Sequence, residues 1–404
     1  MKRRTGEIPA GERITGEGVI GEGRFGGRLI ARRTTCEKRT GKAPAAGLRT
    51  ARMCAGLIAL PLLVCLGIML AAGNSRAQTA GAASLTITPG ARADGMGRAF
   101  VALPTDASAN FWNPAALAYE KGRVFGLMHA QLVPDLADDV YYENLGYAMH
   151  LPGWGGVGAS LVYLSYGKSM AMDENGIEGG LFTSYEISPQ VHIGTEVLKG
   201  LGAGLTLKYV YVNLAPAWAT TEKTAGAGDT FAADFGLLLR VHDMFPSLLP
   251  VPVSFGVNVQ NLGPNIAYID QAQSDPIGRN LKIGIGAQVL NLPKVTGIVA
   301  YDFNQSLVGT MFRFADPIKT FGPWFVFYNV DKPVHNVGAE LTYGDFVSLR
   351  GGYIYDKQGD VMDPTFGIGF LVKLGVNNLG VDYASVPQAR VLDRVNKFSL
   401  TFRF

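Results

Sequence analysis

The sequence contains few cysteines and few charges. Only three of its 404 residues are Cys, and Asp, Glu, Lys and Arg together make up 17 %, whereas soluble domains are nearer a quarter charged. Three cysteines are too few for a disulfide scaffold, and the net charge of +3 is too small for a nucleic-acid binder. Aromatic residues reach 10 %, which argues against a disordered chain.

The charge is unevenly distributed along the chain. Residues 1–52 carry 13 Lys and Arg against five Glu, whereas residues 78–404 carry 22 basic and 28 acidic residues, a net charge of −6. All three cysteines lie before residue 78. We therefore expect an acidic, thiol-free body, preceded over 1–52 by a basic unstructured extension that reflects a mis-assigned start or has no structural consequence.

A leader-like segment separates these two parts. Residues 57–70 form an uncharged apolar core that follows basic residues and ends in small residues at 75–77. This three-part layout predicts a secretory signal peptide over 53–77, cleaved near Ala77. The alternative is an uncleaved transmembrane anchor, which Pro61 within the apolar core disfavours.

Beyond residue 77 the chain alternates apolar with polar or small residues. In 201–211 the odd positions read Leu, Ala, Leu, Leu, Tyr, Tyr and the even positions Gly, Gly, Thr, Lys, Val. A period of two predicts strands with one apolar face. Sixteen segments are candidates for such strands: 122–131, 140–150, 156–168, 184–196, 201–211, 229–241, 251–260, 281–290, 295–303, 308–314, 320–328, 364–374, 377–384, 398–404 and the two arms of a hairpin within 336–355.

The connections between these segments alternate in length. Tight connections are 151–156, 291–294, 344–346 and 375–378, and long polar ones are 214–229, 264–280 and 385–394. Tight turns at one edge, long loops at the other and apolar outward faces predict an all-β fold, a transmembrane antiparallel β-barrel over 121–404. A soluble β-sandwich is the alternative, but its apolar residues would line an interior between two sheets.

The hairpin within 336–355 predicts its own register. If its apolar residues share one face, Tyr343 pairs with Val347 across 344–346. Glu340 then lies opposite Arg350 on the other face, which we expect to be the barrel lumen.

The closing segment has an aromatic face that ends at the last residue. This pattern resembles the signal by which the barrel-assembly machinery recognises outer-membrane barrels. The residues on that face are Phe398, Leu400, Phe402 and Phe404.

Residues 78–120 precede the first strand and contain a compact motif, GMGRAFVALPTDASANFWNPAAL at 95–117. Its glycines allow a close backbone turn, and Asn113 followed by Pro114 predicts a short helix over 114–120. We expect 78–120 to form a plug inside the barrel or against its periplasmic mouth. The plug residues are Gly95, Gly97, Arg98, Asp106, Asn110, Asn113, Pro114 and Ala115.

This segment resembles the FadL-like outer-membrane proteins and, within them, the PorV/PorQ family of type IX secretion. The resemblance continues at 258–268, at 280–284 and in the closing strands, and covers 84–404. It includes a loop motif formed by Asn261, Leu262 and Gly263. The resemblance implies a 14-stranded barrel, so we expect the segments between 295 and 328 to be over-divided.

The resemblance also implies a function and partners. A PorV-like barrel is expected to act as a shuttle that receives folded cargo with a C-terminal signal domain at the translocon barrel. It would deliver this cargo to the surface attachment machinery, with 214–229, 264–280 and 385–394 as docking loops. The alternative is a FadL-like channel for hydrophobic compounds such as long-chain fatty acids. Either function places the protein in the outer membrane of a diderm bacterium, in contact with lipid and not with nucleic acid.

An enzymatic function is not supported by the sequence. It has no Gly-x-Ser-x-Gly, His-Glu-x-x-His or phosphate-loop motif, and its five His lack metal-ligand spacing. We expect no cofactor and no metal. The inward-facing charges are interpreted as residues that pair in a lumen: Asp234, Asp302, Arg313, Glu340, Arg350, Lys373 and Asp382.

Overall fold

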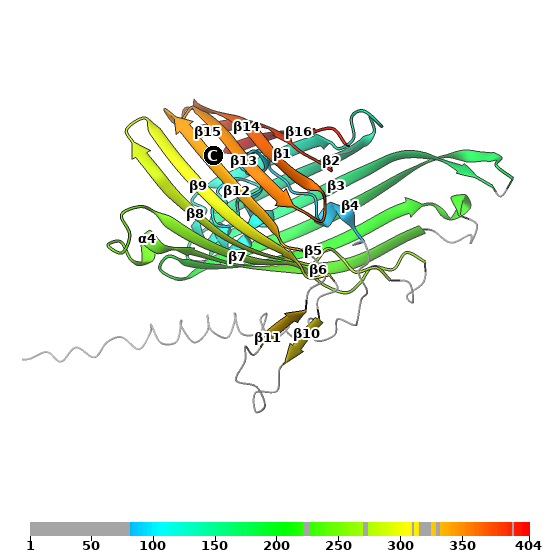
Figure 1. Cartoon of the computed structure of the whole chain (residues 1–404), viewed down its shortest axis with the longest axis horizontal. Helices are drawn as coiled ribbons and strands as arrows, with labels where there is room; N and C mark the ends of the chain where they lie inside the picture. The colour runs from blue at the N-terminus through cyan, green and yellow to red at the C-terminus, as the bar shows by residue number, and fades with distance from the viewer. Residues whose placement is uncertain are drawn as a thin grey trace, which may run out of the picture. The chain divides into compact units, whose positions relative to one another are not determined.

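The protein is described by a computed structural model (Figure 1). It describes residues 81–404 apart from 174, 221–225, 270–273, 309–310, 315–324, 329–331 and 390–391. The chain divides into two compact units, 1–52 and 53–404, and all described residues belong to the second. Within the described ranges, no helix is both long and apolar enough to cross a bilayer.

Fourteen antiparallel strands close into a barrel in the order β1-β16-β15-β14-β13-β12-β9-β8-β7-β6-β5-β4-β3-β2 (Figure 1). The predicted fold class is therefore confirmed. The strands are β1 (Arg123–Gln131), β2 (Val140–Leu151), β3 (Gly155–Met172), β4 (Glu178–Leu198), β5 (Leu201–Ala215), β6 (Gly226–Arg240), β7 (Val253–Leu262), β8 (Asn280–Leu292), β9 (Val295–Ser306), β12 (Val334–Tyr343), β13 (Val347–Asp356), β14 (Val361–Leu374), β15 (Asn377–Val386) and β16 (Val395–Arg403).

Two further strands do not belong to the barrel. β10 (Met311–Phe314) and β11 (Phe325–Tyr328) form a separate two-stranded sheet, while β9 pairs directly with β12. The expected over-division between 295 and 328 is thus confirmed, and the barrel has 14 strands rather than 16. The side chain of Arg313, expected in the lumen, lies outside the described residues.

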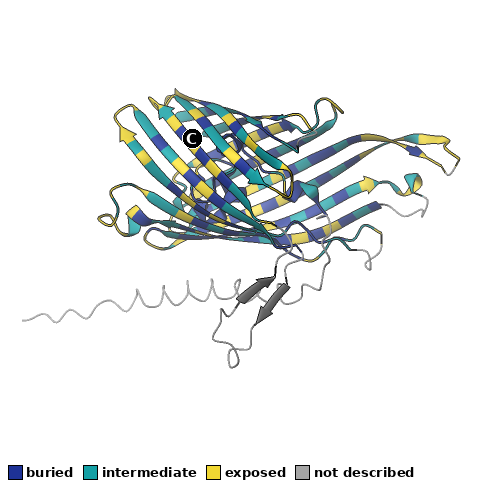
Figure 2. Ribbon diagram, in the orientation of Figure 1, coloured by how far each residue is buried: buried dark blue, intermediate teal, exposed yellow. Residues whose placement is uncertain are grey.

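Burial alternates along the strands with a period of two (Figure 2). In β1 the exposed Phe125 and Leu127 alternate with the buried Val124, Gly126 and Met128. Phe398 and Leu400 of β16 lie on the same exposed face, whereas the polar Lys397 and Ser399 are buried. Large apolar side chains therefore face outward, as a lipid environment requires, and the polar side chains face the lumen.

The two edges of the barrel differ in connection length. One edge carries the short turns 152–154, 293–294, 344–346 and 375–376 and one longer connection, 241–252, that contains α4 (Val241–Met244). The other edge carries the long connections 263–279 and 307–333 together with short ones at 173–177 and 357–360. We call these the turn edge and the loop edge, and the turn edge of such barrels faces the periplasm. The first strand begins and the last strand ends at the turn edge, since β1 pairs antiparallel with β2, which ends at the turn 152–154. Arg123 and Phe404 exchange backbone hydrogen bonds there.

The hairpin of β3 and β4 projects beyond its neighbours at the loop edge (Figure 1). Strand β2 pairs with β3 only as far as Tyr166, and β5 pairs with β4 only as far as Tyr185. A row of neighbouring rings, Tyr141, Tyr163, Tyr185 and Tyr211, crosses β2–β5 near this level. Such aromatic rows mark the membrane interface, so residues 168–173 and 175–183 extend past it.

Residues 81–120, here called the N-terminal segment, occupy the barrel lumen. Their elements are η1 (Ala83–Leu85), α2 (Ala91–Gly95), α3 (Ala109–Trp112) and η2 (Pro114–Tyr119). Gly81 bridges Ile277 near the loop edge, and Glu120 pairs with Arg403 at the turn edge. The segment therefore runs the length of the lumen. The helix predicted over 114–120 is confirmed as η2, and the Asn113 side chain caps it by accepting from the Ala115 N–H.

Candidate functional site: the N-terminal segment in the lumen

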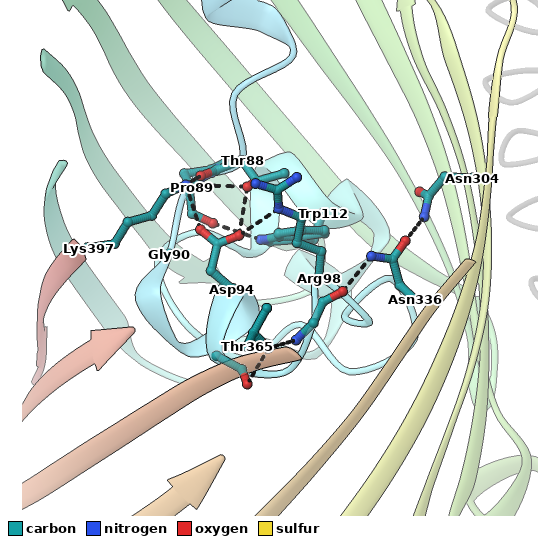
Figure 3. Close-up of polar contacts among 12 residues, drawn as sticks. Thr88, Pro89, Gly90, Asp94, Arg98, Trp112, Asn304, Asn336, Thr365 and Lys397 are labelled. Carbon is teal, nitrogen blue, oxygen red and sulfur yellow. Dashed lines mark hydrogen bonds and ion pairs between the residues drawn. The ribbon is translucent and has the colours of Figure 1, made fainter. Parts of the chain in front are cut away.

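Asp94 is the centre of a buried polar cluster in the lumen (Figure 3). Its Oδ1 accepts from Thr88 Oγ1 at 2.8 Å and from Arg98 Nε at 3.1 Å, and its Oδ2 lies 2.7 Å from Lys397 Nζ. Lys397 also donates to the Thr88 carbonyl at 2.8 Å. Because Lys397 belongs to β16, this cluster fastens the N-terminal segment to the last strand of the barrel.

A second cluster joins the segment to β12, β13 and β15. Glu340 accepts from Arg92 and, at 2.6 Å, from Arg350 Nε, and Arg350 Nη1 lies 2.6 Å from Asp382 Oδ1. The pairing of Glu340 with Arg350 is the register that the apolar pattern predicts, and Tyr343 pairs with Val347 in the same ladder. The predicted pair is thus part of a larger network whose member from the segment is Arg92.

Gly97 forms a turn that lies directly on the barrel wall. Its φ is +66°, and a Cβ there would lie 2.4 Å from the Val337 carbonyl oxygen. Its N–H donates to Thr365 Oγ1 at 2.9 Å, and its carbonyl accepts from Asn336 Nδ2 (Figure 3). Gly95, at the end of α2, would place a Cβ 3.0 Å from the Gly367 backbone. Only glycine fits both the conformation and the spacing at position 97.

Wall side chains also bind the backbone in the middle of the segment. Asp302 Oδ2 accepts from the N–H groups of Phe100 and Val101 at 2.7 and 2.9 Å. Gln260 Nε2 donates to the Phe111 carbonyl at 2.6 Å, and Asn258 Nδ2 to the Trp112 carbonyl at 2.9 Å. Backbone N–H and carbonyl groups of the N-terminal segment that lack partners within the segment are therefore hydrogen-bonded by side chains of the wall.

The Asn-Pro motif lies against β6. Asn113 Nδ2 donates to the Leu237 carbonyl at 2.9 Å and to the Val101 carbonyl at 3.1 Å. A Cβ at Gly236 would lie 2.2 Å from Asn113 Oδ1 and 2.8 Å from Pro114 Cδ. The lack of a side chain at Gly236 therefore makes room for this turn against β6. Ala115 follows within η2 and is fully buried.

The remaining residues predicted for a plug make local contacts or are buried. Asp106 Oδ1 accepts from the Ser108 N–H at 2.8 Å and from its hydroxyl at 2.6 Å, which orders the turn before α3. Asn110 is buried within α3. Arg98 adopts a left-handed φ of 64° and bonds Asp94, so it belongs to the cluster described above.

The start of the N-terminal segment is held near the loop edge. Glu186 of β4 accepts from the N–H groups of Ala83 and Ser84 at 3.0 and 2.8 Å, and from the Tyr166 hydroxyl. Ile266 and Ile277, both fully buried, pack on the segment's first residues. Part of 264–280, predicted as a docking loop, is therefore folded onto the segment.

The Asn261 motif differs from its predicted setting. Asn261 and Leu262 belong to β7, and only Gly263 lies in the following connection. Asn261 adopts a left-handed φ of 57°, and its Oδ1 accepts from Lys208 Nζ at 2.8 Å. Lys208 in turn pairs with the buried Asp234 at 2.7 Å. The motif thus ends β7 beside the buried Lys208–Asp234 ion pair. The backbone N–H of Asn261 donates to Asp234 Oδ1, which satisfies the irregular backbone there.

Two other predictions concern a charge on β14 and the aromatic face of β16. Lys373 was expected to pair in the lumen, but it lies exposed near the turn edge, 3.5 Å from the exposed Asp345. Its position on β14 is too close to the strand end for burial, so that prediction is wrong. Phe398, Leu400 and Phe404 are exposed on the outward face, with Phe402 partly exposed beside them.

Sequence reasoning missed several residues that hold the segment. Asp94, Lys397 and Thr365 carry its strongest contacts, although they lie far apart in the sequence. For Thr365 and Lys397 the signal is weak: a polar residue at an inward position of a strand. Asp94 lies in α2 of the N-terminal segment, where strand alternation gives no signal. Starting the last strand at 398 rather than 395 left Lys397 outside the predicted ladder.

The sequence profile of the family described as "Type IX secretion system protein PorV" matches residues 70–313, more than half of the chain. The chain belongs to this family. PorV-family membership implies a role in type IX secretion and association with its components. The family is one of transport barrels, not enzymes, and the 14-stranded barrel is of the outer-membrane type. No curated protein matches the sequence.

Several solved structures resemble this PorV-family barrel. The toluene transporter TbuX of Ralstonia pickettii shares 13 % identity with a TM-score of 0.47, covering 77 % of this chain and 96 % of that one. The toluene transporter TodX of Pseudomonas putida shares 15 % identity with a TM-score of 0.46, covering 78 % and 96 %. A FadL homologue of Pseudomonas aeruginosa shares 11 % identity with a TM-score of 0.40, covering 77 % and 97 %.

Proposed function

We propose that this PorV-family barrel is a cargo shuttle of type IX secretion. It receives folded cargo through a C-terminal signal domain at the translocon barrel and delivers it to the surface attachment machinery. The observation that carries the proposal is the exposed apolar side chains near the tip of the β3–β4 hairpin, which projects at the loop edge. A shuttle needs such a docking surface and a lumen that does not leak.

The hairpin tip exposes large apolar side chains beyond the aromatic row. Met172, Ile177 and Leu181 are 61 %, 64 % and 62 % exposed. Exposed apolar side chains that gather on a surface outside the bilayer mark protein interaction sites. The tip is therefore the surface we assign to cargo or translocon.

The connection between β5 and β6 extends this surface. Trp218, in η3 (Ala217–Ala219), is largely exposed and lies edge-on to Phe182 of the hairpin, with ring centroids 6.1 Å apart. The proposed docking loop 214–229 therefore adjoins the hairpin tip. The loop 385–394 remains part of the proposal, whereas the buried residues of 264–280 serve the N-terminal segment.

The lumen supports the same proposal. Hydrogen bonds and ion pairs join the N-terminal segment to strands all around the wall, including β4, β6, β7, β9, β12, β14 and β16. A segment held in this way favours a closed barrel that carries partners on its outer surface. We propose that it is the plug of the barrel.

The test removes the apolar tip and asks whether cargo still binds. The double variant Met172→Asp/Ile177→Asp is expressed in the native bacterium, and solubilised barrels are isolated with a tag. We expect the variant to lose co-purifying cargo and translocon barrel, while its heat-modifiable migration stays unchanged. Leu136→Asp is the matched control, because Leu136 is 77 % exposed in the β1–β2 connection of the same edge. Equal recovery of cargo with all three proteins would reject the proposed surface.

The proposed export route has its own test. Residues 53–77 lie outside the described ranges, and the proposal is that cleavage near Ala77 removes them with the basic extension. N-terminal sequencing of the barrel from outer membranes should begin near Gln78. A mature chain that begins at Met1 would contradict the cleavage.

Uptake of hydrophobic compounds is the competing function. It requires an apolar route through the lumen, whereas the lumenal cavity combines apolar residues such as Leu85 and Phe111 with amide and charged side chains. Complementation of a strain deficient in long-chain fatty-acid uptake distinguishes the two functions. Restored uptake together with no cargo binding would favour the channel.

A further inference from the structure

A cavity of about 340 Å³ lies between the N-terminal segment and the wall formed by β7, β8 and β9. Phe111 and Leu85 of the segment contribute its apolar lining. The amide side chains of Gln260, Asn261 and Asn304 contribute polar groups from the wall. Such a cavity, with a few convergent polar groups, is the ordinary form of a small-molecule site.

Lys282 of β8 faces this cavity without a direct ion pair among the described residues. It is 6 % exposed and lines the cavity, and its Nζ lies 4.5 Å from the centre of the Trp112 ring and 5.2 Å from that of Phe111. Within the described part of the chain, its Nζ forms neither a hydrogen bond nor an ion pair. The rings attract the cation but do not replace the hydrogen bonds that an ammonium group makes in water.

The other two buried lysines of the lumen show what Lys282 lacks. Lys208 lies 2.7 Å from Asp234, and Lys397 lies 2.7 Å from Asp94. Buried ammonium groups are normally paired in this way. The carboxylate of Asp302 attracts Lys282 electrostatically. Its Oδ2 accepts from backbone N–H groups of the N-terminal segment, and no direct contact joins it to Lys282 Nζ among the described residues, so the ammonium group keeps its donors for an added anion.

The rest of the cavity favours the same ligand charge. Arg279 and Lys332 line it beside Lys282, against a single carboxylate, Asp356, among the described lining residues. The Asp356 Oδ1 accepts from the backbone N–H groups of Gln358 and Gly359. The charged lining groups therefore sum to a positive charge.

One wall acceptor indicates a further property of the ligand. Asn304 Oδ1 is buried without a hydrogen-bond partner, while its Nδ2 donates to Asn336 at 2.7 Å. A free carbonyl oxygen beside a cation suits a molecule that carries hydroxyl donors as well as an anionic group.

We propose that this cavity binds a small hydroxylated organic anion, a sugar phosphate or sugar acid. Lys282 contacts the anionic group, Arg279 and Lys332 supply further positive charge, and Asn304 Oδ1 accepts from a hydroxyl. Phe111 and Trp112 lie beneath Lys282, so the site is completed by the N-terminal segment and not by the barrel wall alone.

Titration calorimetry on the full barrel in detergent tests the site. The probes are glucose 1-phosphate, glucuronate and inorganic phosphate, with neutral glucose as the reference. We expect glucose 1-phosphate or glucuronate to bind and glucose not to bind. Lys282→Gln should weaken binding by about tenfold or more, as loss of a charged hydrogen bond does, while Lys282→Arg retains most of it.

Lys373→Gln is the matched control, because it removes one positive charge from the exposed rim. It should bind the anion like the wild type. If Lys282→Gln fails to fold, Arg279→Gln and Lys332→Gln provide the same test from less buried positions. The proposal is overturned if no anion binds the wild type, if the cavity variants bind normally, or if Lys373→Gln is equally impaired.

Discussion

Glu340 holds Arg92 in a two-point ion pair, with Arg92 Nε 2.8 Å from Oε2 and Nη2 2.7 Å from Oε1. Arg350 binds the same carboxylate from the neighbouring strand. One acidic side chain of the wall therefore neutralises a cation of the N-terminal segment and a cation of the barrel. Glu340 therefore links the β12–β13 register pair to the position of the N-terminal segment.

Glu340→Gln should destabilise the barrel and loosen the segment. The change leaves Arg92 and Arg350 with one fewer negative charge in a buried setting, and breaking a buried ion pair in this way costs about 3–5 kcal/mol. Urea unfolding in detergent should show this loss, and planar-bilayer recordings should show increased ion leakage. Asp345→Asn, which breaks the exposed pair with Lys373, should change the free energy of unfolding by less than about 1 kcal/mol. An equal effect of both variants would contradict the assignment.

Asp94 and Lys397 should be energetically coupled. Asp94→Asn and Lys397→Gln each leave a buried partner without its opposite charge, whereas the double variant removes both charges. We expect the double variant to be less destabilised than the sum of the two single variants, with a coupling of about 1–3 kcal/mol. A double-mutant cycle of unfolding free energies measures it. Strict additivity would show that the 2.7 Å contact contributes little.

Gly97→Ala should displace the N-terminal segment from the wall. Its left-handed φ of +66° and the 2.4 Å approach to the Val337 carbonyl oxygen both exclude a Cβ, and the conformation alone costs about 1–2 kcal/mol. Protease digestion of folded barrels should cleave the segment faster in this variant. Gly351→Ala is the control, because nothing lies within 4 Å of a Cβ there. Equal cleavage rates in the two variants would argue against a tight contact at Gly97.

The turn of the β3–β4 hairpin should loosen in acid. The pKa of Asp173 lies below its ordinary value of 3.8, because its carboxylate accepts from the N–H groups of Ile177 and Asn175. These bonds favour the ionised form, so the turn is fully stabilised above that ordinary value. It loses this support as the pH falls through the lowered pKa.

Hydrogen exchange of peptides covering 175–183, corrected for the intrinsic effect of pH, measures this loss. Asp173→Ala should show the low protection at neutral pH that the wild type reaches only in acid. Asp345→Asn, at the opposite edge, should leave the hairpin unchanged. Identical protection in wild type and Asp173→Ala would refute the role of this carboxylate.

Much of the barrel could be predicted because strand signals are local. The alternation in 337–343 and 347–355 determined both the outward face and the register, since a slip by one residue would exchange the faces. The same argument predicted the short helix after Asn113, where a capping side chain and Pro114 act within a few residues. Family resemblance was needed to choose 14 strands, because the sequence over 308–314 and 320–328 also predicts strands.

The polar contacts of the lumen were less accessible to this reasoning. Thr88 and Lys397 lie 309 positions apart and meet only after the barrel closes. Alternation places Lys397 on an inward face but does not say which part of the N-terminal segment lies beside it. Lys282 is a further case, since neither its lack of a direct ion pair among the described residues nor its position over Trp112 follows from strand periodicity.

The sequence by itself determined an antiparallel barrel with an apolar outer face, its hairpin register and a capped turn before the first strand. These features depend on neighbouring residues and on the two-residue period of a strand. Only the tertiary structure decided how the N-terminal segment crosses the lumen, which charges pair there and which cation faces the cavity. The physical reason is that closing the barrel brings together side chains from distant strands, and these contacts have no local pattern along the chain.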